Sequence, residues 1–448
     1  MCRERSLWLL GIVSWDSDSK GGSPLYCKRH EDDLFLQPRI IRILRIESSV
    51  PICAIRGETS SLTLCTVYVR LYFMEKHLVR RDKIRRVIAK QKLDALLITH
   101  PINIQYLTGF TGGAGCLLIK PDGDTILSDP RFSIQIPEEC PGLHAVIRPR
   151  NEPTSKTLAK LLGKTTAGKL GIESESVTIA QQERLFGHLA HWQSVPTKSV
   201  VEELRQIKDK DEIAQIRCAI AVAAAGFQFI QKFVQANQHS LEIFSEINLC
   251  NFLVDQMRHL GHAKAASIVP ESFSTIVGAG ARAALPHAKP SGQTLKGQSH
   301  VLFDWGCVVD GYMCDLTRVL ILSPDSKKLR TIYETVLKAN EAAIAAIKPG
   351  KTCEEIDAVA RNIITESGFG KHFGHGLGHS LGLQIHENPR LAPGDKTVIK
   401  PGMVLTVEPA IYLKNWGGVR IEDDILVTRS GCEVLSRALP KAFEEMII

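Results

Sequence analysis

The pattern of apolar and polar residues changes near Met74. Residues 1–73 contain short apolar pieces broken by Gly, Ser and charged residues, without sustained helical or strand periodicity. From Met74 a helix is predicted, with Ile84, Val87 and Ile88 at helical spacing among Arg and Lys. We therefore expect residues 1–73 to be a poorly structured extension, and Met74 is a candidate for the true start of the protein.

Helical and strand-like segments alternate over residues 74–204, which predicts an α/β domain. Strands are expected at 95–98 and 112–119, a loop at 103–110, and a turn at 121–124. Gly112-Gly113-x-Gly115 lacks the spacing of a phosphate-binding loop, so a tight turn is expected there. We find no catalytic constellation in this domain.

After a linker at 201–207, residues 205–448 combine helices with strand-like runs. The first helix carries Ile213, Ile216 and Ile220 on one face, and the second is expected at about 240–260, capped by Ser240. Helices are also expected at 327–347 and 353–367. Strand-like runs around 301–322, 404–407 and 418–427 complete a second domain of mixed α/β type.

Composition excludes several classes of protein. The net charge of +7 is scattered, so nucleic-acid binding is not expected. The sequence contains no run of 18 apolar residues, so no membrane span is expected. The start, MCRERSLWLLGIVSW, is similar to a secretory signal but lacks a cleavage site. The 12 cysteines include no CxxC pair, which is typical of reduced thiols in a cytoplasmic protein.

Two aspartates on a predicted hairpin are the first candidate site residues. Asp310-Gly311 is a strong turn signal, and it places position 304 opposite 317. Asp304 and Asp315 then share a face, diagonally, with Cβ atoms about 7 Å apart. Two carboxylates on an apolar hairpin repel each other unless a cation neutralises them. The alternatives are a solvent-facing pair or an ion pair with Arg318.

Three histidines and two glutamates follow within 50 residues. HGLGHSLGLQIHE contains His375, His379 and His386 in a glycine-rich frame that permits close backbone approach to a ligand. Glu408 ends an apolar strand, and Glu422 lies in the strand-like run 418–427. These residues supply a possible ligand set of two aspartates, two glutamates and one histidine. Such an oxygen-rich set suits a pair of Mn²⁺ or similar ions better than a single zinc.

The motifs STIVGAGARAALPH, FDWGCVVDGYMCDLTR, GHGLGHSLGLQIHE, TVEP and RIEDD occur in the order found in the proline-peptidase branch of the creatinase/methionine-aminopeptidase superfamily. The chain resembles these Xaa-Pro aminopeptidases and dipeptidases over about 80–430. The resemblance implies an N-terminal creatinase-like domain (74–204), a catalytic domain of the pita-bread fold (205–448), and a homodimer. It implies hydrolysis of peptides that have proline at the second position.

The resemblance also assigns the site. It implies two divalent metals, with manganese preferred and cobalt or zinc also suitable. The implied metal ligands are Asp304, Asp315, His379, Glu408 and Glu422. The implied substrate-handling residues are His287, His375, His386 and Arg420, with Glu408 also accepting a proton.

Trp305 and Ser380 depart from the family pattern without altering a ligand, which puts substrate preference in doubt. Two other functions stay open: a metal-free creatinase-like hydrolase, and a non-catalytic peptide-binding protein on an inactive peptidase domain. The complete ligand set disfavours both. Methionine aminopeptidase is disfavoured by the additional N-terminal domain.

Overall fold

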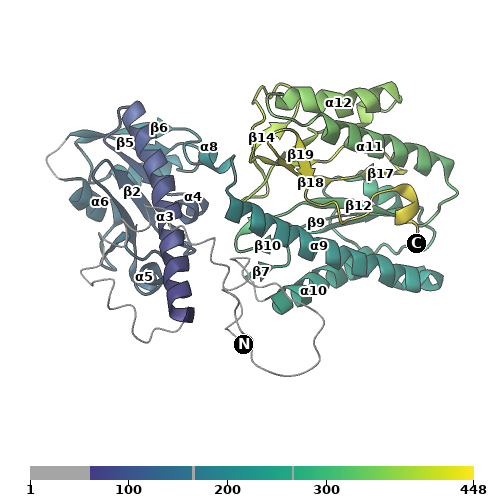
Figure 1. Cartoon of the computed structure of the whole chain (residues 1–448), viewed down its shortest axis with the longest axis horizontal. Coiled ribbons are helices and arrows are strands. Elements are labelled where there is room, and N and C mark those ends of the chain that lie inside the picture. The colour runs from purple at the N-terminus through teal and green to yellow at the C-terminus, as the bar shows by residue number, and fades with distance from the viewer. Residues whose placement is uncertain (1–60, 164–166, 265–266) are drawn as a thin grey trace, which may run out of the picture.

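The computed structural model describes residues 61–163, 167–264 and 267–448, in two parts joined near the short helix α8 (Glu202–Arg205) (Figure 1). Most of the expected extension, residues 1–60, lies outside the described residues. Its last residues, from Ser61, belong to helix α3 (Ser61–Lys90), which therefore begins upstream of Met74.

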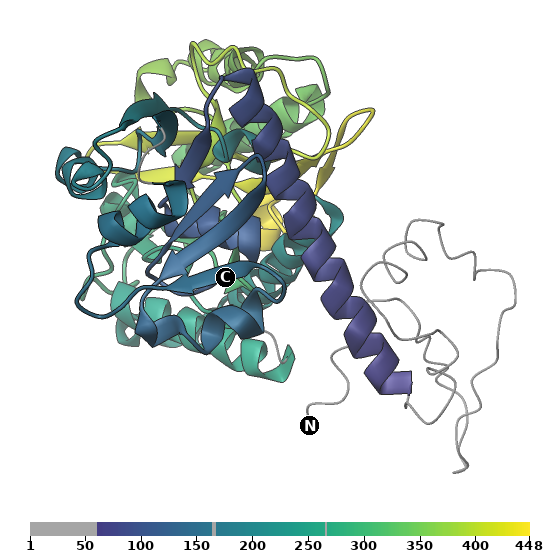
Figure 2. The same cartoon turned by 90° about the vertical axis from the view of Figure 1, so that its left-hand side faces the viewer.

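A mixed six-stranded sheet, in the order β4-β3-β2-β1-β5-β6, forms the centre of the N-terminal part. Helix α3 runs beside it (Figure 2) and buries Ile84 and Ile88, two of the three apolar positions that predicted a helix. The elements that follow α3 are β1 (Ala95–Ile98), α4 (Pro101–Thr108), β2 (Cys116–Lys120), β3 (Gly123–Ser128), α5 (Gln135–Glu139), β4 (His144–Ile147), α6 (Thr154–Leu162), β5 (Gly168–Glu173), α7 (Ile179–Phe186) and β6 (Trp192–Thr197).

The loop predicted at 103–110 is wrong, because most of this segment lies in helix α4. Pro101 occupies the first turn, where its fixed φ suits a helix, and Gly109 closes the helix in the left-handed conformation at φ 85°. The strand predicted at 112–119 begins later, at Cys116, and Gly112–Gly115 lies in the loop before it. The turn at 121–124 is confirmed, since it joins β2 and β3.

In the C-terminal part, the strands lie between two pairs of helices (Figure 1): α9 (Lys210–Ala236) with α10 (Glu246–Lys264), and α11 (Lys327–Ala346) with α12 (Cys353–Glu366). The predicted Ser240 cap is wrong. Ser240 has a non-helical backbone at φ −131°, within a 3₁₀ segment. Helix α10 begins later, where the Ser245 hydroxyl accepts the Asn248 N–H at 3.2 Å.

Two sheets carry the candidate site. One has the order β12-β9-β8, the other β14-β13-β15-β18-β19, and a bridge between Thr317 and Glu422 joins them. The predicted strand 418–427 is divided into β17 and β18, in different sheets, with the break at 421–422. The strands are β7 (Ile268–Val269), β8 (Ile276–Ala279), β9 (His300–Trp305), β10 (Val308–Val309), β11 (Tyr312–Met313), β12 (Leu316–Ile321), β13 (Gly378–Ser380), β14 (Glu387–Leu391), β15 (Val404–Val407), β16 (Ala410–Leu413), β17 (Gly417–Arg420), β18 (Asp423–Val427) and β19 (Cys432–Val434).

Helix α9 is the helix among the described residues that has the length and apolar composition of a membrane span, and half of that window is buried inside the protein. It contacts α10 and the hairpin strands β10 and β11. Trp305 stacks on Phe227 of α9 with ring centroids 4.5 Å apart. These contacts are those of a core helix. All described cysteines whose side chains are placed are free thiols, in agreement with the prediction for them.

Candidate metal centre

The hairpin brings Asp304 and Asp315 together as its turn predicted. Asp310 and Gly311 have φ values of 48° and 88°, which are the conformations of a two-residue hairpin turn that matches strand twist. Asp304 lies opposite Thr317 in the β9–β12 ladder, in the predicted register. Both aspartates are buried, with exposures of 7% and 6%. Their carboxylates are therefore removed from water on the face that points toward β13 and β15.

Strand β13 places His379 between these aspartates and Glu408. The His379 Nε2 atom lies 3.6 Å from Asp315 Oδ2 and 3.6 Å from Glu408 Oε1. The Nδ1 atom lies 3.1 Å from the Ser380 carbonyl, so we assign the ring proton to Nδ1. Nε2 is then left with a free lone pair directed at the carboxylates, which is the form of histidine that binds a metal.

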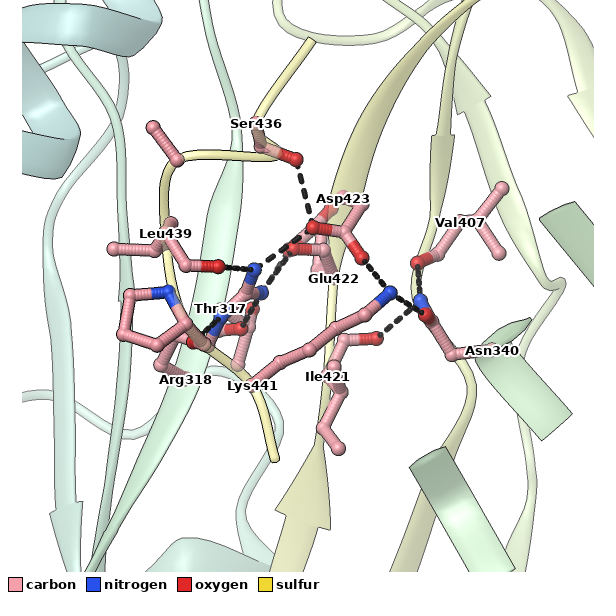
Figure 3. A network of polar contacts seen from close by, with 12 residues as sticks. Thr317, Arg318, Asn340, Val407, Ile421, Glu422, Asp423, Ser436, Leu439 and Lys441 are labelled. Atoms are coloured by element: carbon pink, nitrogen blue, oxygen red, sulfur yellow. Dashed lines mark hydrogen bonds and ion pairs between the residues drawn. The ribbon is translucent and has the colours of Figure 1, made fainter. Parts of the chain in front are cut away.

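Glu422 reaches the same space from the break between β17 and β18. Its Oε2 atom accepts the Thr317 hydroxyl at 2.6 Å, and its backbone N–H donates to the Thr317 carbonyl at 3.2 Å. Arg318, which is fully buried, donates to the Glu422 carbonyl at 2.6 Å and pairs with Asp423 at 2.8 Å (Figure 3). The backbone of Glu422 is thus held on both sides of its side chain.

A second part of this network fixes the backbone beside both glutamates (Figure 3). The Asn340 side-chain amide donates to the carbonyls of Val407 at 3.0 Å and Ile421 at 3.3 Å. These residues directly precede Glu408 and Glu422. Lys441 donates to the Asn340 side-chain oxygen at 2.7 Å, which orients the amide.

The buried carboxylates of the site repel one another electrostatically. Burial, together with neighbouring negative charges, raises the pKa of Asp315 and Glu408, and raises that of Glu422 to about 8. Burial lowers the pKa of His379 to about 3, so this ring is neutral. Arg420 is the cation in direct contact with the cluster, through Asp304.

The donor set fits divalent cations. One ligand atom each from Asp315, His379 and Glu422 lies within 4.8 Å of the others. Asp304 Oδ1 and Glu422 Oε1 are buried oxygens without a hydrogen-bond partner among the described residues. Because a buried anionic oxygen without a partner is costly, a cation at this point would satisfy both the charge and the orphaned atoms.

Arg420 and Tyr412 form an adjoining cluster, in which Tyr412 and Thr317 are residues that the sequence did not single out. Arg420 donates to Tyr412 Oη at 2.6 Å and to Thr317 Oγ1 at 3.0 Å, and it pairs with Asp304. The Tyr412 hydroxyl also lies 3.3 Å from His375 Nε2. The carboxylate that Arg420 holds is therefore one of the protein's own.

His386 and His287 border the cluster from the exposed side. The His386 ring lies edge to face with His379, with centroids 4.5 Å apart. His287 is exposed and lies within electrostatic range of Asp304, His375 and His386. A polar cavity of about 180 Å³ lies beside His386. The structure thus brings all of the residues predicted for the site into one region.

Comparison with known proteins agrees with this arrangement. Residues 214–429 match metallopeptidase family M24, and residues 80–207 match the creatinase/prolidase N-terminal domain. The uncharacterized peptidase YqhT of Bacillus subtilis (strain 168) is 34% identical over 370 residues, which are 83% of this chain and 100% of the relative. The chain belongs to metallopeptidase family M24.

Solved structures place this M24 chain in the proline-peptidase branch. An Xaa-Pro dipeptidase from Bacillus anthracis matches with a TM-score of 0.75 and 35% identity, over 83% of this chain and 100% of that one. An X-Pro aminopeptidase from Thermotoga maritima MSB8 matches with a TM-score of 0.69 and 29% identity, over 80% and 97%. The predicted fold, a creatinase-like domain followed by a pita-bread domain, is confirmed.

Proposed function

We propose that this M24 protein hydrolyses the Xaa-Pro bond at the N-terminus of peptides, with two divalent metal ions, manganese preferred and cobalt or zinc also suitable. The observation that carries the proposal is the buried cluster of Asp315, His379 and Glu422, with Glu408 3.6 Å from His379 and with unpartnered carboxylate oxygens on Asp304 and Glu422. Relatives named Xaa-Pro dipeptidase and X-Pro aminopeptidase support the substrate class. Reduced thiols support a cytoplasmic enzyme, and the family supports a homodimer.

Asp304, Asp315, His379, Glu408 and Glu422 would hold the ions, with Asp315, His379 and Glu422 offering ligand atoms within 4.8 Å of one another. When bound, the ions supply Lewis acidity, which polarises the substrate carbonyl and lowers the pKa of water.

The remaining residues would handle the peptide. A water oxygen forms the new bond to the carbonyl carbon, the bond from that carbon to the proline nitrogen breaks, and the nitrogen takes up a proton. Glu408 would accept the proton from water and carry it to the nitrogen. His386 would donate to the carbonyl oxygen as negative charge develops there. His287 and His375 would orient the peptide, and Arg420 would hold Asp304 in place.

The test is hydrolysis of Xaa-Pro and Xaa-Pro-Yaa peptides by metal-stripped protein before and after addition of Mn²⁺. Matched peptides with alanine in place of proline and the Asp315→Ala variant serve as controls. We expect cleavage that requires metal, proline and Asp315, and the ratio of dipeptide to tripeptide turnover will identify the subclass. Metal-independent cleavage would favour a creatinase-like hydrolase, and metal binding without cleavage of either peptide would contradict the proposed substrate.

A further inference from the structure

Two residues that directly follow site histidines, Ser380 after His379 and Glu387 after His386, are paired across the β13–β14 ladder. The ladder shifts register between His379 and Ser380, and His386 lies just before β14 begins at Glu387. The side chains of Ser380 and Glu387 both contact residues at the junction with the N-terminal domain, namely Lys208 and Arg205.

Two cations, Arg205 on α8 and Lys208 shortly after it, contact these two side chains. Arg205, on α8, lies 2.5 Å from Glu387 Oε1, and Lys208 lies 3.2 Å from Glu387 Oε2. Lys208 also donates to the Ser380 hydroxyl at 2.9 Å. The side chains of Arg205, Lys208 and Glu387 are only 3%, 1% and 7% exposed. We call Arg205, Lys208, Ser380 and Glu387 the linker clamp.

The linker clamp is continuous with the N-terminal sheet. Arg205 donates to Asn103 Oδ1 at 2.8 Å, and Asn103, on α4, donates to Glu173 at the end of β5 at 2.7 Å. The backbone also comes close to the clamp. A Cβ atom on Gly382 would lie 2.9 Å from Glu387 Oε1, so the segment between β13 and β14 is packed directly against the clamp.

Stability alone does not account for the linker clamp. Burying two cations with one carboxylate costs desolvation, and replacing such groups with apolar side chains is often neutral or stabilising. Each clamp residue of the catalytic part directly follows a site histidine in the sequence, Ser380 after His379 and Glu387 after His386. A movement of either clamp residue therefore moves the histidine beside it.

We propose that the linker clamp is a positioning device through which the linker and N-terminal domain set the positions of His379 and His386. The part that concerns His386 rests on the proposed function, whereas the part that concerns His379 requires only that the site binds metal. Without the Glu387 charge, two buried cations would repel each other, and the segment between β13 and β14 would shift away from the linker.

The experiment compares Glu387→Gln and Arg205→Met with the wild type in kcat, KM, Mn²⁺ affinity by calorimetry, and Tm. Removing a partner that orients a metal ligand typically costs 10–100-fold in metal affinity or activity. We expect Mn²⁺ affinity and kcat to fall by about tenfold or more with KM nearly unchanged. The double variant Glu387→Gln, Arg205→Met should lose less Mn²⁺ affinity and kcat than the product of the two single losses, because both substitutions break the same contact. Arg205→Lys is a milder change and should also lower Mn²⁺ affinity and kcat.

The matched control is Arg80→Met. Arg80 also joins the two parts of the protein, lying 2.7 Å from Asp209 and 3.1 Å from Glu212, and its side chain is 6% exposed. Its partners Tyr106, Asp209 and Glu212 all lie outside β13 and β14, so Arg80→Met should lower Tm and leave kcat and Mn²⁺ affinity unchanged. If Glu387→Gln behaves in the same way as Arg80→Met, the inference is overturned. If the wild type fails to cleave Xaa-Pro peptides, the proposed function falls and the Mn²⁺ affinities still decide the inference.

Discussion

At the scale of single residues, Thr317 connects three parts of the candidate centre. Its hydroxyl donates to Glu422 at 2.6 Å and accepts from Arg420 at 3.0 Å, and its backbone lies opposite Asp304. An uncharged residue in a strand gives no chemical signal in a sequence. The predicted hairpin register already placed position 317 beside the first ligand, and only the contacts of Glu422 and Arg420 show what the hydroxyl does.

Thr317→Val keeps the shape of the side chain and removes its hydroxyl. A hydrogen bond to a charged group contributes about 1.5–3 kcal/mol. If Glu422 loses this bond in the metal-bound state, Mn²⁺ affinity should fall by roughly tenfold or more. Calorimetric titration of the metal-stripped variant measures the change. Thr331→Val removes an exposed hydroxyl of α11 and should leave the affinity unaltered; equal affinities in both variants would contradict this role.

At the scale of elements, the approach of β13 to β15 depends on one glycine. A Cβ atom on Gly378 would lie 2.1 Å from the Thr406 carbonyl oxygen, so a larger residue must push the strands apart. These strands carry His379 and lead into Glu408. The glycine-rich frame predicted close backbone approach to a ligand, whereas at Gly378 the close approach is between two strands.

Gly378→Ala should therefore weaken folding and metal binding together, with a lower Tm and a loss of Mn²⁺ affinity. Gly374→Ala, in the same glycine-rich segment, is the control, because nothing lies within 4 Å of its added Cβ. Thermal unfolding and metal titration of both variants measure the difference. If the two variants prove equivalent, the Gly378 contact does not hold the centre together.

Local signals explain which elements could be predicted. The hairpin follows from Asp310-Gly311, a two-residue signal that fixes the register by itself. The helix at 101–108 differs from the expected loop, although Pro101 and Gly109 mark its two ends. The partners Arg205 and Glu387 are 182 residues apart. No spacing rule reports a contact of that kind, so the linker clamp required the three-dimensional structure.

At the scale of the whole molecule, the metal-free protein contains buried groups whose ionisation opposes folding in different pH ranges. Burial lowers the pKa of His300 and His375 to about 4 and that of His379 to about 3. The unfolded chain binds more protons than the folded protein at these histidines. Their contribution therefore makes the unfolding free energy rise as the pH rises toward 6.5.

Above pH 6.5, the site carboxylates reverse this trend. The pKa of Glu422 is raised from 4.5 to about 8, so between these values the folded protein holds a proton that the unfolded chain has released. Its contribution therefore lowers the unfolding free energy of the metal-free protein as the pH rises from 6.5 to 8. Bound cations favour the ionised carboxylates, so Mn²⁺ should stabilise the protein more at pH 8 than at pH 6.5.

Calorimetric Tm values at pH 6.5 and 8, with a chelator or with Mn²⁺, measure both effects. Because other groups also titrate, the decisive comparison is between the wild type and Glu422→Gln, whose side chain cannot ionise. Without metal, the variant should lose less Tm than the wild type between pH 6.5 and 8. Addition of Mn²⁺ at pH 8 should raise the Tm of the variant less than that of the wild type. An identical pH dependence in both proteins would mean that Glu422 is already ionised in the metal-free fold, and that the repulsion inferred for the cluster is absent.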